Sequence, residues 1–433
     1  MKLAVVVQRY GVEVSGGAEL HARYIAEHLS RHADVRVLTT CARDYITWKN
    51  EFPAGETLVN AIPVERFPVA RERNLRVFAR RSACVFDGIH SLQEELDWLD
   101  SEGPVSPALL ERLKRGSAEF DFVLFFCVRY HHVVHGMPLV GPRAVLVPTA
   151  EREPSIGLSL MPSVFLSARA VMFNTDEERA LIEGVCGTHL NGPVVGVGSE
   201  IPSDISDARA RHRFGLEGPY LVYVGRIDAN KGCAELFTYF ERYLRRTRRD
   251  LTLVLIGSAV MQIPQHPRIR HLGFVDDQAK FDVIAGSVAL LMPSYFESLS
   301  MVALEAWALG RPVLANGHCD VLAGQCLRSG AGLYYQDADE FAGALDILLD
   351  DPALVQELGR RGAAYYRTHY SWPVIERTYM DTFAQLSNEP APSAVAPRTG
   401  WLERRRRDRP AAAAVVNALP KGPVHPDRSR PRP

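Results

Sequence analysis

Short, continuous hydrophobic runs alternate with segments of helical periodicity along most of the chain. Such a run is typical of a strand buried on both faces of a parallel sheet, and apolar residues three or four positions apart indicate an amphipathic helix. The runs predict strands at residues 2–7, 34–40, 121–128, 144–147, 171–174, 220–224, 251–256, 288–292 and 313–315. Strands that alternate with helices in this way predict an α/β protein built on parallel sheets.

One stretch of the second half, residues 287–316, contains a complete strand, loop, helix and strand. Its helix is expected over residues 300–309, and Gly310 ends it. Because crossovers between parallel strands are right-handed, the loop and the helix start lie at the carboxyl edge of the sheet, where α/β proteins bind ligands. The sequence therefore predicts a ligand site at this edge.

Two glutamates and a helix start give this edge its chemistry. Glu297 lies in the loop and Glu305 lies on the helix, while the amides of residues 298–302 are expected to be free. Free amides at a helix start attract phosphate, and carboxylates accept hydrogen bonds from sugar hydroxyls. This combination suits a nucleotide sugar, although two surface glutamates would match the same spacing.

A basic loop follows the predicted strand 220–224. Residues 225–232 read GRIDANKG and lead into a helix predicted over residues 234–244. Arg226 and Lys231 lie on both sides of this loop, so their charges can converge on one pyrophosphate. The alternative is a pair of solvated cations at a turn.

The first half opens with the strand 2–7, a glycine-rich loop and a helix predicted over residues 18–30. The dinucleotide-binding fingerprint needs Gly-x-Gly-x-x-Gly directly after the strand, whereas Gly16 and Gly17 follow here only after eight further residues. A simple dehydrogenase is therefore disfavoured. The two glycines form either a tight structural turn or a loop that lets a ligand approach closely.

Three motifs in this order resemble the retaining glycosyltransferases of family four, which share the two-lobed GT-B architecture. The motifs are GGAE at residues 16–19, GRIDANKG at 225–232 and PSYFESLSMVALEA at 293–306. The family has glycine at two positions of the third motif, where this chain has Ser298 and Ser300. The resemblance covers roughly residues 1–387 and implies two Rossmann-like lobes, a cleft between them and a C-terminal helix that crosses back onto the first lobe.

The resemblance also implies roles for individual residues. Arg226 and Lys231 would hold the leaving diphosphate, Glu305 the ribose, and Glu297 the transferred sugar. The segment 270–277 would form a short strand that lies along the base. The full set of expected donor-binding residues is Gly16, Gly17, Arg226, Lys231, Phe274, Val275, Glu297, Ser298, Leu299, Ser300, Met301 and Glu305. The architecture generally works without a bound metal, so neither a metal nor a cofactor is expected.

The loop after the predicted strand 144–147 departs from the family. It reads PTAEREP at residues 148–154, where one branch of the family has PTAHDEP. Glu151 thus stands where that branch has a histidine beside the donor sugar, and it joins Glu297, Arg226 and Lys231 as an expected catalytic residue. A carboxylate there can stabilise positive charge or take a proton, but it does not act as a neutral imidazole.

The chain divides into three predicted parts. Residues 1–200, together with the crossing helix 373–387, form the acceptor-side lobe, and residues 201–372 form the nucleotide-sugar-binding lobe. Residues 388–433 are rich in Pro, Ala and Arg and are expected to be a disordered basic tail. Residues 319–332 are predicted to be a loop.

Composition narrows the location and the partners. A net charge of −1 and a hydrophobic content of 47% are typical of a soluble globular protein and offer nothing to nucleic acid. Seven scattered cysteines indicate reduced thiols, and the first apolar run is too short for a signal peptide. We expect a cytoplasmic protein. Its basic segment at residues 71–86 is either a solvated helix face or a surface that contacts anionic lipid at the inner face of the membrane.

A histidine cluster follows the predicted strand 121–128. His131 and His135 are four positions apart, the spacing of paired metal ligands on a helix, and His132 lies between them. No Glu or Cys cluster completes the set in the sequence. Ordinary loop or acceptor-side histidines are therefore favoured over a metal site.

The resemblance implies a retaining hexosyltransferase that moves a sugar from a nucleotide diphosphate sugar to an acceptor hydroxyl, in cell-surface polysaccharide or glycolipid assembly. The acceptor would be another sugar, a lipid-linked oligosaccharide or a metabolite. One alternative is a catalytically inactive nucleotide-sugar-binding scaffold. The other is an epimerase or phosphorylase of the same architecture, for which the sequence shows no free-standing acid/base motif or cofactor lysine.

Overall fold

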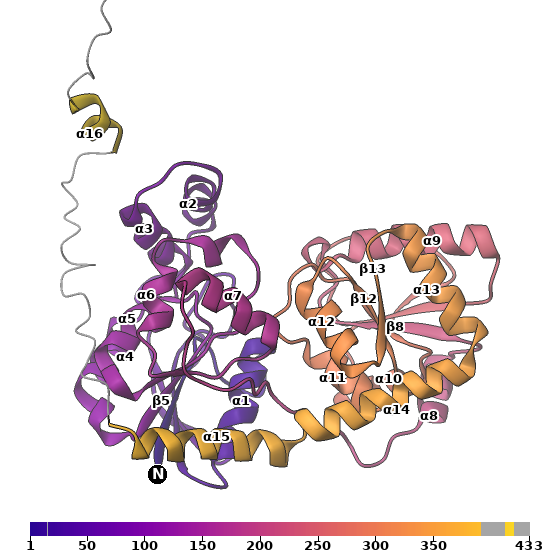
Figure 1. Ribbon diagram of the computed structural model, residues 1–433, viewed down its shortest axis with the longest axis horizontal. Helices are drawn as coiled ribbons and strands as arrows, with labels where there is room; N and C mark the ends of the chain where they lie inside the picture. The colour runs from indigo at the N-terminus through magenta and orange to yellow at the C-terminus, as the bar shows by residue number, and fades with distance from the viewer. Residues whose placement is uncertain (15, 391–411, 420–433) are drawn as a thin grey trace, which may run out of the picture.

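The computed structural model of the chain describes residues 1–14, 16–390 and 412–419. Residues up to 390 form two α/β lobes lying side by side, and the helix within 412–419 lies apart from them (Figure 1). The first lobe contains β1 (Lys2–Val6), α1 (Gly17–Leu29), β2 (Asp34–Thr40), β3 (Gly55–Val59), β4 (Ile62–Phe67), α2 (Leu75–Asp87), α3 (Leu92–Glu102), α4 (Pro107–Gly116), β5 (Phe122–Phe126), α5 (His131–Val140), β6 (Ala144–Val147), α6 (Met161–Leu166), β7 (Ala170–Val171) and α7 (Asp176–Cys186). The second contains α8 (Asp207–Phe214), β8 (Tyr220–Val224), α9 (Cys233–Thr247), β9 (Thr252–Ile256), β10 (Ile269–His271), α10 (Asp277–Gly286), β11 (Leu290–Met292), α11 (Met301–Ala308), β12 (Val313–Asn316), α12 (Asp320–Ser329), β13 (Gly332–Tyr335), α13 (Ala338–Asp350) and α14 (Pro352–His369). Two further helices follow, α15 (Trp372–Asn388) and α16 (Ala412–Ala418).

Each lobe is built on one sheet. The strand order is β3-β4-β2-β1-β5-β6-β7 in the first lobe and β10-β9-β8-β11-β12-β13 in the second. Strand β3 runs antiparallel to β4, and the other paired strands of the described residues are parallel. The order reverses at β1/β5 and at β8/β11, and α/β proteins bind ligands beyond the carboxyl ends of strands at such points.

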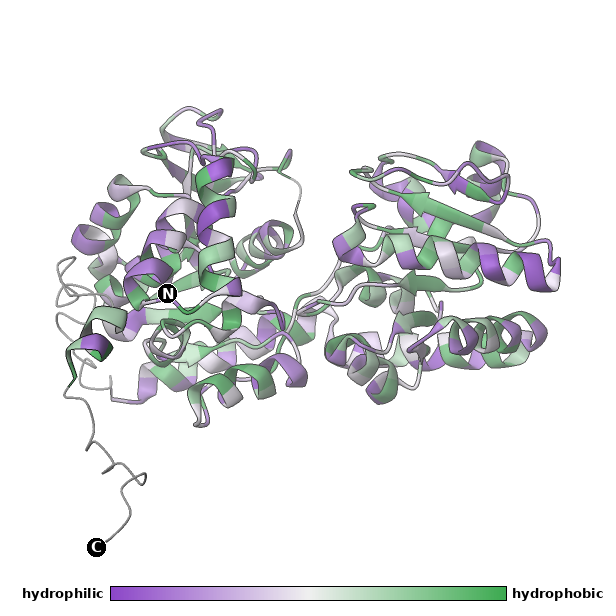
Figure 2. Cartoon of the chain, turned by 90° about the horizontal axis from the view of Figure 1, so that it is seen from above, coloured by the Kyte–Doolittle hydropathy of each residue, from purple (hydrophilic) through white to green (hydrophobic). Residues whose placement is uncertain are grey.

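The hydrophobic runs of the sequence form the centres of both lobes. Figure 2 shows the central strands in green and the more polar positions, in purple, on the surrounding helices. Strands β5, β6 and β9 are buried along their whole length, as expected for strands covered on both faces. In the described part of the chain, no helix combines the length and the apolar character that a bilayer span requires.

The chain crosses between the lobes twice, and the two crossings lie together. Tyr366 of α14 donates from Oη to the carbonyl oxygen of Ser199 and accepts from the Ser199 amide, both at 3.2 Å. Helix α15 then packs on the first lobe, where Trp372 stacks on His28 with 3.4 Å between ring centroids. Glu376 hydrogen-bonds with His28 Nδ1 at 2.6 Å. The two-lobed α/β fold with a returning C-terminal helix is therefore confirmed.

Some local predictions are wrong. Residues 319–332 form α12 and the start of β13 instead of a loop. Val321, Leu322 and Cys326 are buried in the core and form the apolar side of α12. Small and polar residues lie between them in the sequence, so the helical periodicity is hard to recognise. Helices α3 and α4 were not predicted. The proposed tail at residues 388–433 lies largely outside the described residues, and its described part includes α16.

Candidate functional site

The strand reversal of the second sheet places the loops after β8 and β11 side by side. The first loop carries Lys231 at the end of a short 3₁₀ turn, Ala229–Lys231, and the second carries Glu297. Lys231 Nζ donates to Glu297 Oε1 at 2.8 Å. The ion pair therefore joins two motifs that are 66 positions apart in the sequence.

A carboxyl group from the first lobe joins this pair. Burial opposes the charged form of Lys231, but Glu297 and Glu151 outweigh it, so the pKa of the ammonium is raised. Burial raises the pKa of Glu151 to about 7, with Lys231 opposing the rise and Glu297 adding to it. Carboxyl groups from both lobes, Glu151 and Glu297, thus interact with the one ammonium group of Lys231.

The start of α11 presents amides without acceptors. Ser300 caps the helix by accepting a hydrogen bond from the Ala303 amide at 3.3 Å. Its φ of +68° lies in the left-handed region, which explains why the motif usually has glycine there. Hydrogen bonds among the described residues leave the amides of residues 298–302 without a partner. The helix start therefore keeps its capacity to bind an anion.

The neighbouring residues of this turn have different roles. The Leu299 side chain is buried in the core, so its contribution to a ligand is limited to the backbone. Met301 is the first residue of α11. The carbonyl oxygen of Ser298 accepts from Thr175 Oγ1 of the first lobe at 3.2 Å.

Polar contacts bridge the two lobes at this edge. Besides the Thr175 contact, Arg152 Nη2 lies 2.7 Å from Asp320 Oδ2, and Arg328 pairs with Glu177. The loop that carries Glu151 is thereby held close to the second lobe.

Glu305 lies further along α11, deep in the fold. Lys280 of α10 donates to Glu305 Oε1 at 2.9 Å, and Glu305 is only 2% exposed. Burial raises the pKa of this carboxyl, and Lys280 opposes the rise. Oxygen Oε2 is buried and has no hydrogen-bond partner among the described residues. Because an unsatisfied buried acceptor is destabilising, this oxygen fits the expected contact with a ribose hydroxyl.

Arg226 faces the first lobe. Its Nη1 donates to Tyr45 Oη at 2.5 Å, and its Nε lies 2.8 Å from Asp228 Oδ2. Arg9 of the first lobe lies over the same tyrosine ring, 5.5 Å from its centroid. The convergence of Arg226 and Lys231 on one diphosphate stays a prediction, and such a ligand would replace the contact with Tyr45.

The Gly16-Gly17 loop covers a buried ion pair. Arg9 Nη2 lies 2.6 Å from Glu19 Oε1. A Cβ added at Gly16 would lie 2.2 Å from Glu19 Oε2, whereas one added at Gly17 would meet no atom within 4 Å. Gly16 is therefore explained by packing, and Gly17 leaves open space for a ligand.

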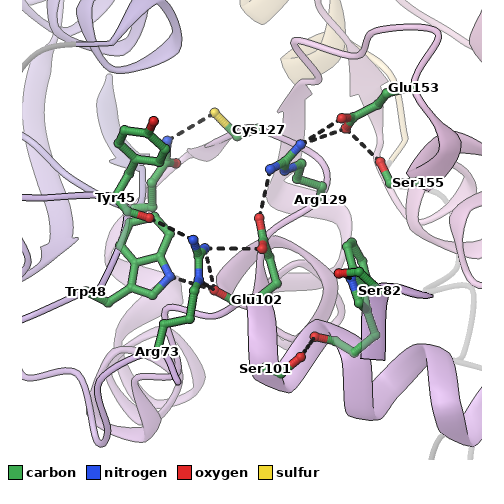
Figure 3. Close-up of polar contacts among 12 residues, drawn as sticks. Tyr45, Trp48, Arg73, Ser82, Ser101, Glu102, Cys127, Arg129, Glu153 and Ser155 are labelled. Atoms are coloured by element: carbon green, nitrogen blue, oxygen red, sulfur yellow. Dashed lines mark hydrogen bonds and ion pairs between the residues drawn. The ribbon is translucent and has the colours of Figure 1, made fainter. Parts of the chain in front are cut away.

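Arg129 anchors the loop that carries Glu151 (Figure 3). Its Nη1 donates to both carboxylate oxygens of Glu153, at 2.8 and 3.0 Å, and its Nη2 donates to Glu102 Oε1 at 2.9 Å. Glu102 is fully buried and also lies 3.2 Å from Arg73 Nη2. A chain of alternating charges thus ties this loop to α3.

Glu178 of α7 supports the same loop from another side. It accepts hydrogen bonds from the amides of Ala150, at 2.6 Å, and Asn174, at 2.5 Å. Burial raises the pKa of Glu178 to about 8, these hydrogen bonds oppose the rise, and Glu151 adds to it. Two carboxyl groups with raised pKa values therefore lie near one another.

The expected base-contacting strand is shorter than predicted. Strand β10 ends at His271, and Gly273, with a φ of +73°, lies in the turn that follows. Phe274 and Val275 therefore lie in a loop, where Phe274 is 85% exposed and Val275 packs partly against the core. Their contact with a base stays a prediction.

Several partners of the site were missed in the sequence, namely Tyr45, Arg129, Glu178 and Lys280. None of them lies in one of the three motifs, and each reaches its partner only through tertiary packing. Thr175 caps α7 by accepting a hydrogen bond from the Glu178 amide at 3.1 Å. A helix cap at Thr175 was the sequence feature that placed Glu178 in the first turn of a helix.

Replacing Gly232 with alanine is expected to displace the loop that carries Lys231. Gly232 has a φ of +73°, and an added Cβ would lie 2.1 Å from the carbonyl oxygen of Pro293 in the adjacent loop. Strain and overpacking together predict a loss of about 2 kcal/mol in the free energy of unfolding. Urea denaturation measures it.

Gly343→Ala is the matched control. Gly343 lies within α13, and its added Cβ would meet no atom within 4 Å. Alanine there should stabilise the chain by about 0.5 to 1 kcal/mol, because glycine loses more backbone entropy in a helix. A Gly232→Ala protein as stable as the parent would contradict the packing described for this loop.

Comparisons with known proteins show what the sequence and the fold resemble. Residues 218–351 match the family model described as Glycosyl transferases group 1. The glycogen synthase of Mycobacterium tuberculosis is 29% identical over 205 residues, 43% of this chain, and the match spans about half of that protein, 48%. The D-inositol 3-phosphate glycosyltransferase of Kribbella flavida is 28% identical over 406 residues, covering 83% of this chain and 89% of that protein. The sucrose-phosphate synthase of Thermosynechococcus elongatus has the same fold, with a TM-score of 0.64, 18% identity and coverage of 89% of this chain and 99% of that one.

Proposed function

We propose that the chain is a group 1 glycosyltransferase that moves a hexose or related sugar from a nucleoside diphosphate sugar to an acceptor hydroxyl, with retention at the anomeric carbon. The family match over residues 218–351, the similar glycosyltransferase sequence and the GT-B fold support this proposal. The observation that carries the proposal is the pairing of Lys231 with Glu297 at 2.8 Å. This pair lies at the strand reversal of the second sheet, and its Glu297 belongs to the loop that leads to the unpaired amides at the start of α11.

The diphosphate is the group on which negative charge grows as the bond to the anomeric carbon breaks. Lys231, Arg226 and the amides of residues 298–302 stabilise that charge, because preorganised donors act strongly in a site from which water is excluded. These groups supply the positive charge within the chain. We therefore propose that neither a metal nor a cofactor takes part.

Carboxylates hold the hydroxylated parts of the donor. Glu305 accepts from the ribose through its unpartnered Oε2, and Glu297 accepts from hydroxyls of the transferred sugar. Glu151 reaches the same place from the first lobe. With a pKa of about 7, it stabilises positive charge at the anomeric carbon when ionised and accepts a proton near neutral pH.

The proposed setting is the cytoplasm, in the assembly of a cell-surface polysaccharide or glycolipid. The acceptor is a sugar, a lipid-linked oligosaccharide or a metabolite. Helix α2 supports contact with anionic lipid at the inner face of the membrane, since it exposes Leu75, Arg76 and Arg80 on its surface.

Nucleoside diphosphates and their sugars provide the test. A ligand at about 100 times its dissociation constant adds about 2.7 kcal/mol to the free energy of unfolding, and we expect one nucleotide series to do so. Release of free nucleoside diphosphate is then measured with candidate acceptors. A chain that no nucleoside diphosphate stabilises would contradict the proposal.

A nucleotide-sugar-binding scaffold without turnover is the second candidate. One observation favours it: Glu151 stands where a branch of the family has a histidine. Tight nucleotide binding without release of diphosphate, whatever the acceptor, would identify the scaffold.

A further inference from the structure

Two histidines and an aspartate from different helices form a cluster that the proposed reaction does not use. His131 and His135 lie one turn apart on α5, with 4.5 Å between ring centroids. Asp100 of α3 brings Oδ1 to 3.7 Å from His131 Nε2. One ligand atom of each residue lies within 4.8 Å of the other two. The sequence did not reveal Asp100, because it is 31 positions away from His131 in the chain.

The two imidazoles have no hydrogen-bond partner among the described residues. His131 is only 7% exposed, its Nδ1 is buried without a partner, and its Nε2 is directed at Asp100. A buried polar side chain is normally hydrogen-bonded, and leaving it unsatisfied costs about 1 to 3 kcal/mol. Helices α3 and α5 pack together, so the backbone keeps these three side chains near one another.

We propose that Asp100, His131 and His135 bind a divalent transition-metal ion of the zinc type. Two imidazoles and a carboxylate are ligands that Zn²⁺ accepts, at about 2.0 to 2.2 Å, with a fourth position left for water. The Asp100 side chain is 43% exposed, so it is free to turn toward the ion, and solvent gives the ion access.

Arg71 competes for the same carboxylate. Its Nη2 lies 3.6 Å from Asp100 Oδ2 and donates to the Asp100 carbonyl oxygen at 3.2 Å. An arriving dication therefore displaces this guanidinium from the carboxylate. Removing the arginine side chain should consequently tighten metal binding, while removing a ligand should weaken it.

The ion would fasten α3 to α5 beside the ion pair that anchors the loop of Glu151. Asp100 lies two residues before Glu102, and His131 lies two residues after Arg129. The ion would thus lie behind the loop and outside the proposed sugar-transfer site. Its test is independent of sugar transfer.

Calorimetric titration of the full, untagged, chelator-treated chain with ZnCl₂ tests the proposal. We expect one saturable equivalent, bound at least about tenfold more weakly in His135→Ala and in Asp100→Asn and more tightly in Arg71→Ala. His189→Ala, which removes an exposed histidine elsewhere, is the matched control and should bind as the parent does. Circular dichroism confirms that each variant is folded.

No saturable binding to the parent would overturn the site, and so would an unchanged affinity in both ligand variants. X-ray absorption of the zinc-loaded chain adds a direct readout. It should show nitrogen and oxygen neighbours with the scattering pattern of two imidazoles in the parent, and fewer imidazoles in His135→Ala. An unchanged spectrum in that variant would place the ion elsewhere.

Discussion

Lys231→Ala is expected to lower the rate of sugar transfer by a factor of about 100 or more, on the scale of losing one charge-stabilising donor. The ammonium pairs with Glu297 at 2.8 Å and with Glu151 through their opposite charges. Its removal leaves two carboxylates facing the position of the diphosphate without an intervening cation. Initial rates of nucleoside diphosphate release, with and without acceptor, measure the effect.

Lys114→Ala is the control, since this lysine is exposed on α4 and belongs to no motif. It should leave transfer unchanged. Should Lys231→Ala transfer sugar at the parent rate, Lys231 would have no part in the reaction, and the arrangement proposed for the diphosphate would fail with it.

Stability is expected to fall with rising pH because of Glu151. Burial raises the pKa of this carboxyl from 4.5 to about 7, so the folded chain binds the proton more tightly than the unfolded chain. The contribution of Glu151 to stability is therefore fully present below the pKa that this carboxyl has in the unfolded chain. It is lost as the pH rises through the pKa that it has in the folded chain. A shift of this size is worth at most about 3 kcal/mol.

Urea denaturation of the parent and of Glu151→Gln, at several values between about pH 5 and pH 8, isolates the effect. The free energy of unfolding should fall more steeply with pH in the parent. Between the lowest and the highest pH, the decrease in the parent should exceed the decrease in Glu151→Gln by up to about 3 kcal/mol. Glu178, whose pKa is also raised by burial, remains in both proteins and contributes to both curves. Parallel curves would show that Glu151 ionises normally in the folded chain.

Much of the fold followed from the hydrophobic pattern, because a parallel strand buried on both faces needs a continuous apolar run. Strands β2, β6 and β8 begin and end at the predicted residues. Helix α12 escaped prediction, since its apolar positions are interrupted by Gly324 and Gln325. Periodicity alone does not separate such a helix from a loop.

Contacts of the site were predictable from the sequence only where the order of the strands alone brings the residues together. Lys231 and Glu297 follow adjacent strands, so the strand-edge rule brings them together. The contact between Arg226 and Tyr45 depends on how the two lobes pack, and the bond between Glu305 and Lys280 depends on which face α10 turns inward. Neither leaves a pattern in the chain.

The paired crossings at Tyr366 and Ser199 make the two lobes a pivoted assembly. Because the crossings lie together, the second lobe can rotate about one point without stretching either of them. The contacts that would break on opening, such as the exposed pair Arg152–Asp320, are worth about 0 to 1 kcal/mol each. If the proposed donor is held by both lobes, its contacts outweigh such pairs, and donor occupancy is then expected to shift the lobes toward the closed arrangement.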